Sequence, residues 1–227
     1  MTDLLYLAFN RLEFTRRSFS TMLANTDWSK IDRLLVYDDG SSDGTREYLA
    51  EQVARAPVES SLRATQKLGP VGIMVDYLSR TEEDGLFVKI DNDVMLPPGW
   101  LGRGLEVMAS DPTIDLLGIE AIRPLGPGPH RFLPAVHIGG IGFMRIRAFE
   151  GCAPTPRGRY GFTKWQTSHD RVKKGWIDPA IPVCLLNLMP FEPWLSLSRE
   201  YVLNGWQRDW PPPMPPECKA HWDWWAP

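Results

Sequence analysis

The chain of 227 residues has few cysteines and lacks a long apolar run and the pattern of a signal peptide. Its 3 cysteines, Cys152, Cys184 and Cys218, are widely spaced and form no CxxC pair, so neither a zinc site nor a dithiol redox site is indicated. We expect these cysteines to be reduced in a cytoplasmic protein. No apolar run approaches the roughly 20 residues of a transmembrane helix, and the N-terminal segment lacks the basic leader and cleavage site of a signal peptide.

An excess of charge of either sign is also missing. The 25 Lys and Arg residues are matched by 28 Asp and Glu residues, which gives a formal net charge of −3. This balance argues against a protein that binds nucleic acid through its overall charge. With 43% hydrophobic and 23% charged residues, the composition is that of a globular protein, and the length suits one compact domain with or without an appendage.

What the chain does contain is an alternation of apolar runs and helix-like segments. The expected strands are Leu4–Phe9, Arg33–Tyr37, Ser61–Thr65, Gly85–Ile90 and Ile114–Ile119. The expected helices between them are Arg11–Asn25, Asp43–Ala54, Gly69–Ser79 and Gly99–Ala109. This alternation predicts an α/β fold with a mostly parallel central sheet that is flanked by helices.

The second half of the chain gives a weaker pattern. Arg123–Pro134 is rich in Pro and Gly and is expected to be a loop, whereas Ala135–Ile146 is apolar and predicts one or two strands with a kink at its glycines. Thr163–Lys174 is expected to be a helix that Gly175 ends. Ile181–Leu186 is the last strand candidate.

The C-terminal segment has an unusual composition. The chain has 10 Trp and 21 Pro, and six of those Trp and eight of those Pro lie between Pro190 and Pro227. This segment is too rich in proline for a helix through its middle and too aromatic for a disordered linker. We therefore treat it as an extension with its own role.

Two acidic clusters follow two of the expected strands. Asp38 and Asp39 come directly after RLLVY, and Asp91-Asn92-Asp93 comes directly after LFVKI. In a parallel α/β sheet both clusters lie at the carboxyl edge, where ligands bind. The spacing of Asp91 and Asp93 can hold Mg²⁺ or Mn²⁺ together with phosphate oxygens of a ligand.

Each cluster also has a simpler interpretation, because Asp, Asn and Gly form turns. Asp38 and Asp39 could accept hydrogen bonds from a base or from ribose hydroxyls. The chain has neither a GxGxxG motif after its first strand nor a GxxxxGK[ST] motif anywhere. A phosphate-binding site here would therefore need a metal ion instead of a glycine-rich loop.

These segments resemble the inverting, nucleotide-sugar-dependent glycosyltransferases of the GT-A fold, which are family 2-like. The resemblance covers roughly residues 4 to 180, and neither acidic cluster is specific without the other. Its five segments are LAFNR, VYDDGSSDGTREYL, VKIDNDVMLPPGWL, HIGGIGFMRIRAFEG and SHDRVKKGWI. The fourth is similar to the strand behind the acceptor site, and the fifth to the start of the helix that carries the catalytic base.

The resemblance implies a role for each matching residue. The residues implied in donor nucleotide binding are Phe9, Asn10, Arg11, Asp38, Asp39, Gly69, Asp91 and Asn92. Asp91 and Asp93 would hold Mn²⁺ or Mg²⁺, with His221 as the favoured third ligand and His169 as the alternative. Asp170 would be the catalytic base, and His169 stands where the family usually has Glu. The helix from Gly69 lacks the Arg-Asn pair that the family often has there.

The resemblance also implies a domain organisation. Residues 1–186 would form the catalytic domain, with a nucleotide-binding half of about 1–95 and an acceptor half of about 96–186. Residues 187–227 would pack over the active site. The residues that would form this lid and acceptor wall are His169, Trp206, Trp210, Trp222, Trp224 and Trp225.

The expected function is metal-assisted transfer of a sugar, with inversion, from a nucleotide-diphosphate sugar to an acceptor hydroxyl. A UDP-sugar is favoured as the donor. The acceptor stays open: a saccharide, a lipid-linked glycan, a protein, a small molecule or a modified nucleobase. Two alternatives stay open as well. One is a nucleotidyltransferase with the same paired-Asp metal site, and the other is a non-catalytic carbohydrate-binding protein, for which the abundant tryptophan argues.

Overall fold

The structure is a computed structural model that describes residues 1–81, 84–119, 131–151, 154, 161–178 and 184–185. Its α-helices are α1 (Leu12–Asn25), α2 (Thr45–Val53), α3 (Gly69–Leu78), α4 (Trp100–Ser110) and α5 (Gly161–Thr167). Its strands are β1 (Thr2–Ala8), β2 (Arg33–Asp38), β3 (Glu59–Ala64), β4 (Leu86–Asp91), β5 (Val94–Met95), β6 (Leu116–Gly118), β7 (Arg131–Pro134), β8 (Gly142–Arg145), β9 (Lys174–Asp178) and β10 (Cys184–Leu185). Two short 3₁₀ helices are η1 (Trp28–Lys30) and η2 (Ile146–Phe149).

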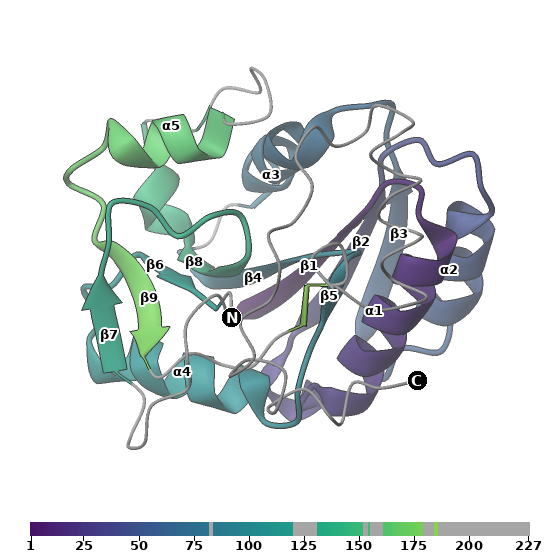
Figure 1. The fold of residues 1–227 in the computed structure, drawn as a ribbon, viewed down its shortest axis with the longest axis horizontal. Helices are drawn as coiled ribbons and strands as arrows, with labels where there is room; N and C mark the ends of the chain where they lie inside the picture. Colours follow the sequence, from purple (N-terminus) through teal and green to yellow (C-terminus); the bar gives the residue numbers. More distant parts are fainter. Residues whose placement is uncertain (82–83, 120–130, 152–153, 155–160, 179–183, 186–227) are drawn as a thin grey trace, which may run out of the picture.

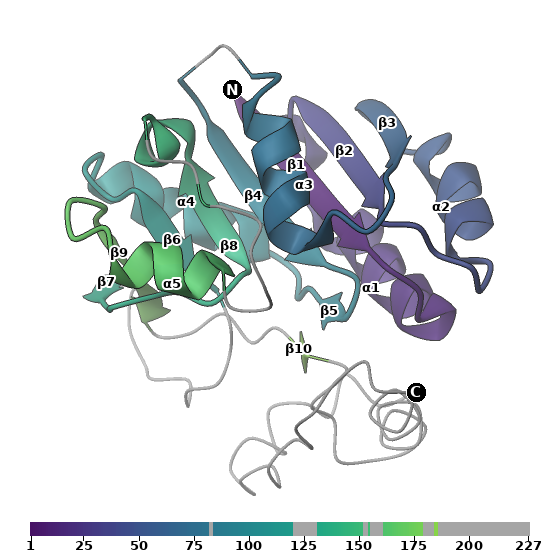
Figure 2. The same ribbon diagram turned by 90° about the horizontal axis from the view of Figure 1, so that it is seen from above.

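Eight of these strands form one sheet in the order β3-β2-β1-β4-β8-β6-β9-β7 (Figures 1 and 2). The first four strands in this order are mutually parallel, and β6 pairs parallel with β9. The other pairings, β4 with β8, β8 with β6 and β9 with β7, are antiparallel. The carboxyl ends of β1, β2 and β4 therefore meet at one edge of the sheet.

The two faces of the sheet are covered by different helices. Along β1, Leu4 and Tyr6 pack with side chains of α1, α2 and α4, whereas Leu5 and Leu7 pack with side chains of α3, α5 and η2. Figure 1 shows these two sets of helices on opposite sides of the strands. Successive side chains of a strand point to opposite faces, so a continuous apolar run is what a strand buried on both faces requires.

The predicted α/β architecture with a central, helix-flanked sheet is confirmed, and the strands expected in the first 120 residues are present. The second half corrects two expectations and meets a third. Arg131–Pro134 is a strand within the expected loop, whereas the apolar run Ala135–Ile146, expected to form one or two strands, forms the single short strand β8. The helix expected over Thr163–Lys174 ends at Thr167, and Lys174 begins β9.

The early end of α5 has a local cause. The hydroxyl of Ser168 bonds back to the carbonyl oxygens of Lys164 and Trp165, which satisfies groups that the next helical turn would otherwise use. Gly175, expected to end a helix, instead lies within β9, opposite Leu117 and Pro134 of neighbouring strands. A β-carbon at Gly175 would lie 2.2 Å from the carbonyl oxygen of Leu133, so this glycine permits close strand pairing.

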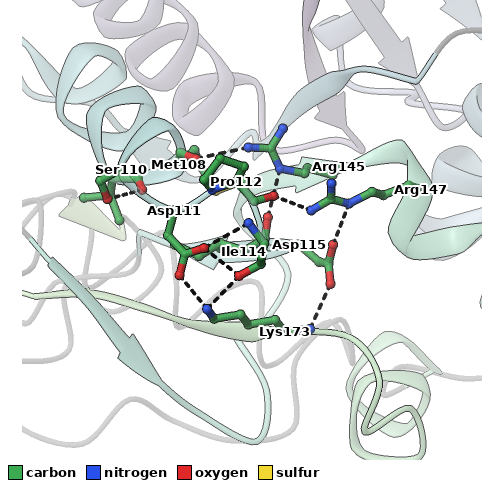
Figure 3. A network of polar contacts seen from close by, with 11 residues as sticks. Met108, Ser110, Asp111, Pro112, Ile114, Asp115, Arg145, Arg147 and Lys173 are labelled. Atoms are coloured by element: carbon green, nitrogen blue, oxygen red, sulfur yellow. Dashed lines mark hydrogen bonds and ion pairs between the residues drawn. The ribbon is translucent and has the colours of Figure 1, made fainter.

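A polar network ties the ends of α4, β6, β8 and β9 together at the opposite edge of the sheet (Figure 3). The Asp115 carboxylate accepts from the Arg147 Nε at 3.0 Å and from the backbone N–H of Lys173 at 2.9 Å. Arg145 donates to the carbonyl oxygens of Met108 and Ile114. This network joins segments that lie far apart in the sequence.

Within the residues described, none of the helices is long and apolar enough to span a membrane.

Candidate functional site

A cavity of about 530 Å³ opens at the carboxyl edge of the sheet. The start of α3, the end of β4, the loop before β8 and the start of α5 surround it. Its lining residues are Lys67, Leu68, Gly69, Pro70, Val71, Met74, Lys89, Asp91, Gly139, Gly140, Phe162 and Thr163. The α3 and Phe162 side chains form an apolar wall, whereas Lys89, Asp91 and the Gly139-Gly140 backbone form a polar one. This combination of an apolar wall and a few converging polar groups is typical of a small-molecule site.

Asp91 is the last residue of β4 and faces this cavity. The Lys89 ammonium lies 2.6 Å from Asp91 Oδ1 and also donates to the carbonyl oxygen of Gly140 at 2.8 Å. Burial raises the pKa of the Asp91 carboxyl above its usual value, and the charge of Lys89 opposes that shift. The Asp91 carboxylate, which stays partly open to the cavity, is thus paired with a buried cation of the protein itself.

Asp93 lies in the turn after β4 and pairs with the residue that precedes α1. The Arg11 guanidinium contacts Asp93 Oδ2 at 2.6 Å. Asn10 and Arg11 adopt the left-handed conformation, with φ of 52° and 64°, which is uncommon for residues with a side chain. This bend at the exit of β1 brings Arg11 to the Asp93 carboxylate.

The side chain of Asn92 points away from the cavity toward the same bend. Its amide donates to the Asn10 carbonyl oxygen at 2.7 Å and to the Thr15 hydroxyl at 2.8 Å, and the residue is buried. Asn92 therefore fixes the turn that carries the two carboxylates against the start of α1. Both hydrogen bonds are with the protein itself, one with a backbone carbonyl and one with a side-chain hydroxyl, and Asn92 does not line the cavity.

The acids of the DDGSSDGT segment hold backbone N–H groups. Asp39 accepts from the N–H groups of Leu68 and Gly69, at 2.7 and 2.8 Å, and from the Thr65 hydroxyl. The buried Asp38 carboxylate accepts from the N–H of Ser41. Asp39 thus shapes the cavity rim at the start of α3, where a negative charge also interacts favourably with the helix dipole.

Asp43 and Asn10 complete the arrangement of this loop. The Asp43 carboxylate accepts from the N–H groups of Leu12 and Thr45, the first residues of α1 and α2. Asn10 donates its N–H to the Ser41 hydroxyl and accepts from the Ser42 N–H. The two sequence segments predicted to contact a nucleotide, Phe9 to Arg11 and the acidic loop, are therefore held side by side.

The loop that closes the cavity is fixed from α5. The buried Gln166 side chain accepts from the Ile138 N–H at 2.8 Å and donates to the Gly139 carbonyl oxygen at 2.9 Å. Phe162 and Trp165 of the same helix stack with Phe149. These contacts set the position of the Gly139-Gly140 backbone opposite Lys89.

The predicted catalytic base lies apart from this cluster. Asp170 is exposed and lies in the turn between α5 and β9. It does not line the cavity, because the cavity is bordered by the N-terminal end of α5 and Asp170 follows the C-terminal end. The ring of His169 stacks on Trp165 with 4.9 Å between the centroids. His221 and the candidate lid residues Trp206, Trp210, Trp222, Trp224 and Trp225 lie outside the described residues.

Sequence reasoning did not identify Lys89 or Gln166. Lys89 left a signal, because it is the one charged residue in the apolar segment GLFVKI before Asp91. Gln166 left none. Within the part of the chain that the structure describes, no cluster of three or more His, Cys, Asp and Glu side chains could hold a metal ion.

Solved structures with the same fold include a mannosyltransferase and S. aureus TarS, which both differ widely from this chain in sequence. Mannosyltransferase PcManGT from Pyrobaculum calidifontis, in complex with GDP-Man and Mn²⁺, superimposes with a TM-score of 0.62 at 14% identity, over 96% of this chain and 67% of that one. S. aureus TarS 1-349 gives a TM-score of 0.56 at 12% identity, over 76% of this chain and 57% of that one. A second structure of S. aureus TarS gives a TM-score of 0.59 at 14% identity, over 89% of this chain and 40% of that one.

The chain thus spans about half the length of the TarS structures it matches. No curated protein matches the sequence. The sequence model of Glycosyl transferase family 2 matches residues 5–133, which include the second half of β1, the acidic loop and the Asp91-Asn92-Asp93 turn. By this match over more than half of its length, and with a GT-A type fold, the chain belongs to glycosyltransferase family 2.

Proposed function

We propose that this protein transfers a sugar from a nucleotide-diphosphate sugar, with a UDP-sugar as the favoured donor, to an acceptor hydroxyl with inversion. The observation that carries this proposal is the cavity whose polar wall contains Asp91 and whose rim is shaped by Asp39. Membership of the family supports it. Two similar structures add support, since TarS was solved with UDP-GlcNAc and PcManGT with GDP-Man.

The donor nucleotide would lie between the exit of β1 and the start of α3. Phe9, Asn10 and Arg11 border it on one side in this proposal, and Asp38, Asp39 and Gly69 border it on the other. Among the residues that the structure describes, the N–H of Gly69 is the one donor to Asp39 Oδ2, which leaves acceptor capacity for a base or a ribose hydroxyl. Asn92 contributes by holding the turn in place.

The residues present fit a divalent cation of the Mn²⁺ or Mg²⁺ type. Asp91 and Asp93 offer oxygen ligands from one turn, and such cations are bound by one or two carboxylates together with substrate phosphates. Mn²⁺ was present in the PcManGT structure. When bound, the cation offsets the negative charge that develops on the leaving diphosphate. His221 is the proposed third protein ligand.

Asp170 is the proposed base that removes the proton from the acceptor hydroxyl.

Residues 1–186 would form the catalytic domain, and residues 187–227 would add the lid. The cavity already combines both proposed halves of that domain, because Lys67 to Asp91 line one side and Gly139 to Thr163 line the other. The acceptor would approach the donor sugar across this boundary.

The test is Mn²⁺-dependent binding of UDP and UDP-sugars, measured by isothermal titration calorimetry. Asp91→Asn should weaken UDP binding in Mn²⁺ by about tenfold or more, because the variant loses a charged metal ligand. Asp27→Asn changes an exposed carboxylate that caps η1 and serves as the matched control. Mn²⁺-dependent binding that survives Asp91→Asn unchanged would refute the metal site.

A further inference from the structure

The two carboxylates of the proposed metal site each contact a cation of the protein itself. Asp91 contacts the Lys89 ammonium at 2.6 Å, and Asp93 contacts the Arg11 guanidinium, also at 2.6 Å. The side chains of Lys89 and Arg11 are only 3% and 14% exposed. Water therefore screens these two ion pairs less than it screens pairs at the surface.

These four groups balance one another in charge. With both pairs ionised, the two positive and two negative charges cancel. A divalent cation that entered this site alone would add two positive charges to a partly buried group that has no net negative charge to offer. Uncompensated charge in such surroundings is costly.

The number of available ligands also argues against binding of a free divalent cation. One oxygen of Asp91 and one of Asp93 are already occupied by a cationic donor. Mg²⁺ requires near-octahedral coordination and keeps several waters or phosphate oxygens when few protein ligands are present. A nucleotide diphosphate supplies both the missing oxygens and at least two compensating negative charges.

Lys89 has a second partner that allows Asp91 to change its contacts. Its ammonium also donates to the Gly140 carbonyl oxygen at 2.8 Å, across the cavity wall. If the Asp91 carboxylate turns toward a metal ion, Lys89 keeps this hydrogen bond and still faces the cavity. Lys89 is therefore placed to remain beside a diphosphate bound there.

From these contacts we infer that Lys89 and Arg11 prevent the carboxylate pair from binding a free divalent cation, so that the metal binds only together with the nucleotide diphosphate. This inference rests on the proposed function. Lys89 and Arg11 are positioning residues in it, because they act on the metal through Asp91 and Asp93. Removing either cation should leave the site with a net negative charge that attracts free metal.

The experiment measures binding of Mn²⁺ alone, and of Mn²⁺ with UDP, by electron paramagnetic resonance of free Mn²⁺. Lys89→Met keeps an unbranched side chain, one atom shorter, and removes its charge. It should bind Mn²⁺ without UDP at least about tenfold more tightly than the wild type. Arg11→Gln tests the second ion pair in the same way. Lys164→Gln makes the same charge change at an exposed site on α5 and should behave as the wild type does.

The outcomes separate this inference from the proposed function. Wild-type protein that takes up Mn²⁺ only with UDP, beside a Lys89→Met variant that takes it up alone, supports the inference. Wild-type protein that binds Mn²⁺ alone as tightly as both variants overturns the inference, while UDP binding that depends on Mn²⁺ keeps the proposed metal site. UDP binding that is indifferent to Mn²⁺ in every variant overturns the metal site itself. Circular dichroism establishes that each variant is folded.

Discussion

At the scale of single residues, the acids of this edge have two different kinds of partner. Asp39 and Asp43 accept hydrogen bonds from backbone N–H groups at the first turns of helices. Asp91 and Asp93 instead pair with cationic side chains. The backbone contacts of Asp39 and Asp43 fix the shape of the site. The ion pairs of Asp91 and Asp93 leave each carboxylate with a second oxygen that can bind an incoming ligand.

The residue that most needs a functional test is Asp170. Asp170→Asn keeps the size of the side chain and removes its ability to take a proton. We expect sugar transfer to fall by about 100-fold or more, in the range that general-base catalysis contributes, while UDP binding changes little. Transfer measured by product formation and binding measured by calorimetry give the two values. Full activity in this variant would move the role of base to another residue, with His169→Gln as the next variant to make.

At the scale of elements, Lys173 joins the end of α4 to the start of β9 (Figure 3). Its ammonium donates to the Asp111 carboxylate and, at 2.8 Å, to the Thr113 hydroxyl. The hydrogen bond from Lys173 comes first among the causes that lower the pKa of Asp111 to about 2, and those from Thr113 come next. Ionised Asp111 is therefore favoured in the folded protein.

The pH dependence of stability follows from this shift. Because the folded-state pKa is lowered, the stabilisation is fully present above about pH 4 and is lost as the pH falls through about pH 2. Asp111→Asn should lower the free energy of unfolding near neutral pH, and the difference from the wild type should shrink in acid. Urea unfolding at several pH values measures this difference in the free energy of unfolding. Glu106→Gln, on the exposed side of α4, is the control. A difference that stays constant down to about pH 2 would contradict this role.

The elements that sequence reasoning predicted are those with a local signal. The strands and helices from Leu4 to Ala109 are separated by clear turn residues. Parallel strands are joined by a crossover helix, so the alternation of strand and helix along the chain is enough to predict this part of the sheet. The short β7, β8 and β9 are different, because they are held by antiparallel or long-range pairing that no single segment encodes. In KKGWID, the glycine after two lysines is typical of a helix end, and only the pairing with β6 and β7 makes it a strand.

The same distinction applies to the site. Asp91, Asp93 and Asp39 stand at predicted strand ends, so their arrival at one edge follows from the topology. Lys89 could also have been placed beside Asp91, because residues two apart on a strand lie on the same face. The contact of Gln166 does not follow in this way, because Gln166 reaches Gly139 from a helix more than twenty residues later. That contact depends on tertiary packing that the sequence pattern does not specify.

At the scale of the whole molecule, the cavity lies in the middle of the sheet, where β4 of the parallel half is next to β8. Lys89 and Asp91 belong to the parallel half, whereas Gly139, Gly140 and Phe162 come with the antiparallel half. The family model ends at residue 133, near the point where the second group begins. The part of the wall that would contact a donor sugar or an acceptor therefore lies largely beyond the shared sequence, where loops vary among proteins of one fold.

The proposed lid gives the last prediction. Deleting Glu217–Pro227 removes His221, Trp222, Trp224 and Trp225 together, and it should weaken Mn²⁺-dependent UDP binding by about tenfold, as loss of support at a metal site does. His221→Ala alone should reproduce this loss if metal ligation is the reason, whereas Trp222→Ala should spare UDP binding and lower transfer to the acceptor. Calorimetry and product formation separate these effects. If the deletion leaves donor binding unchanged but lowers the midpoint of thermal unfolding, the segment serves to cover apolar core, and the third metal ligand must come from the nucleotide or from water.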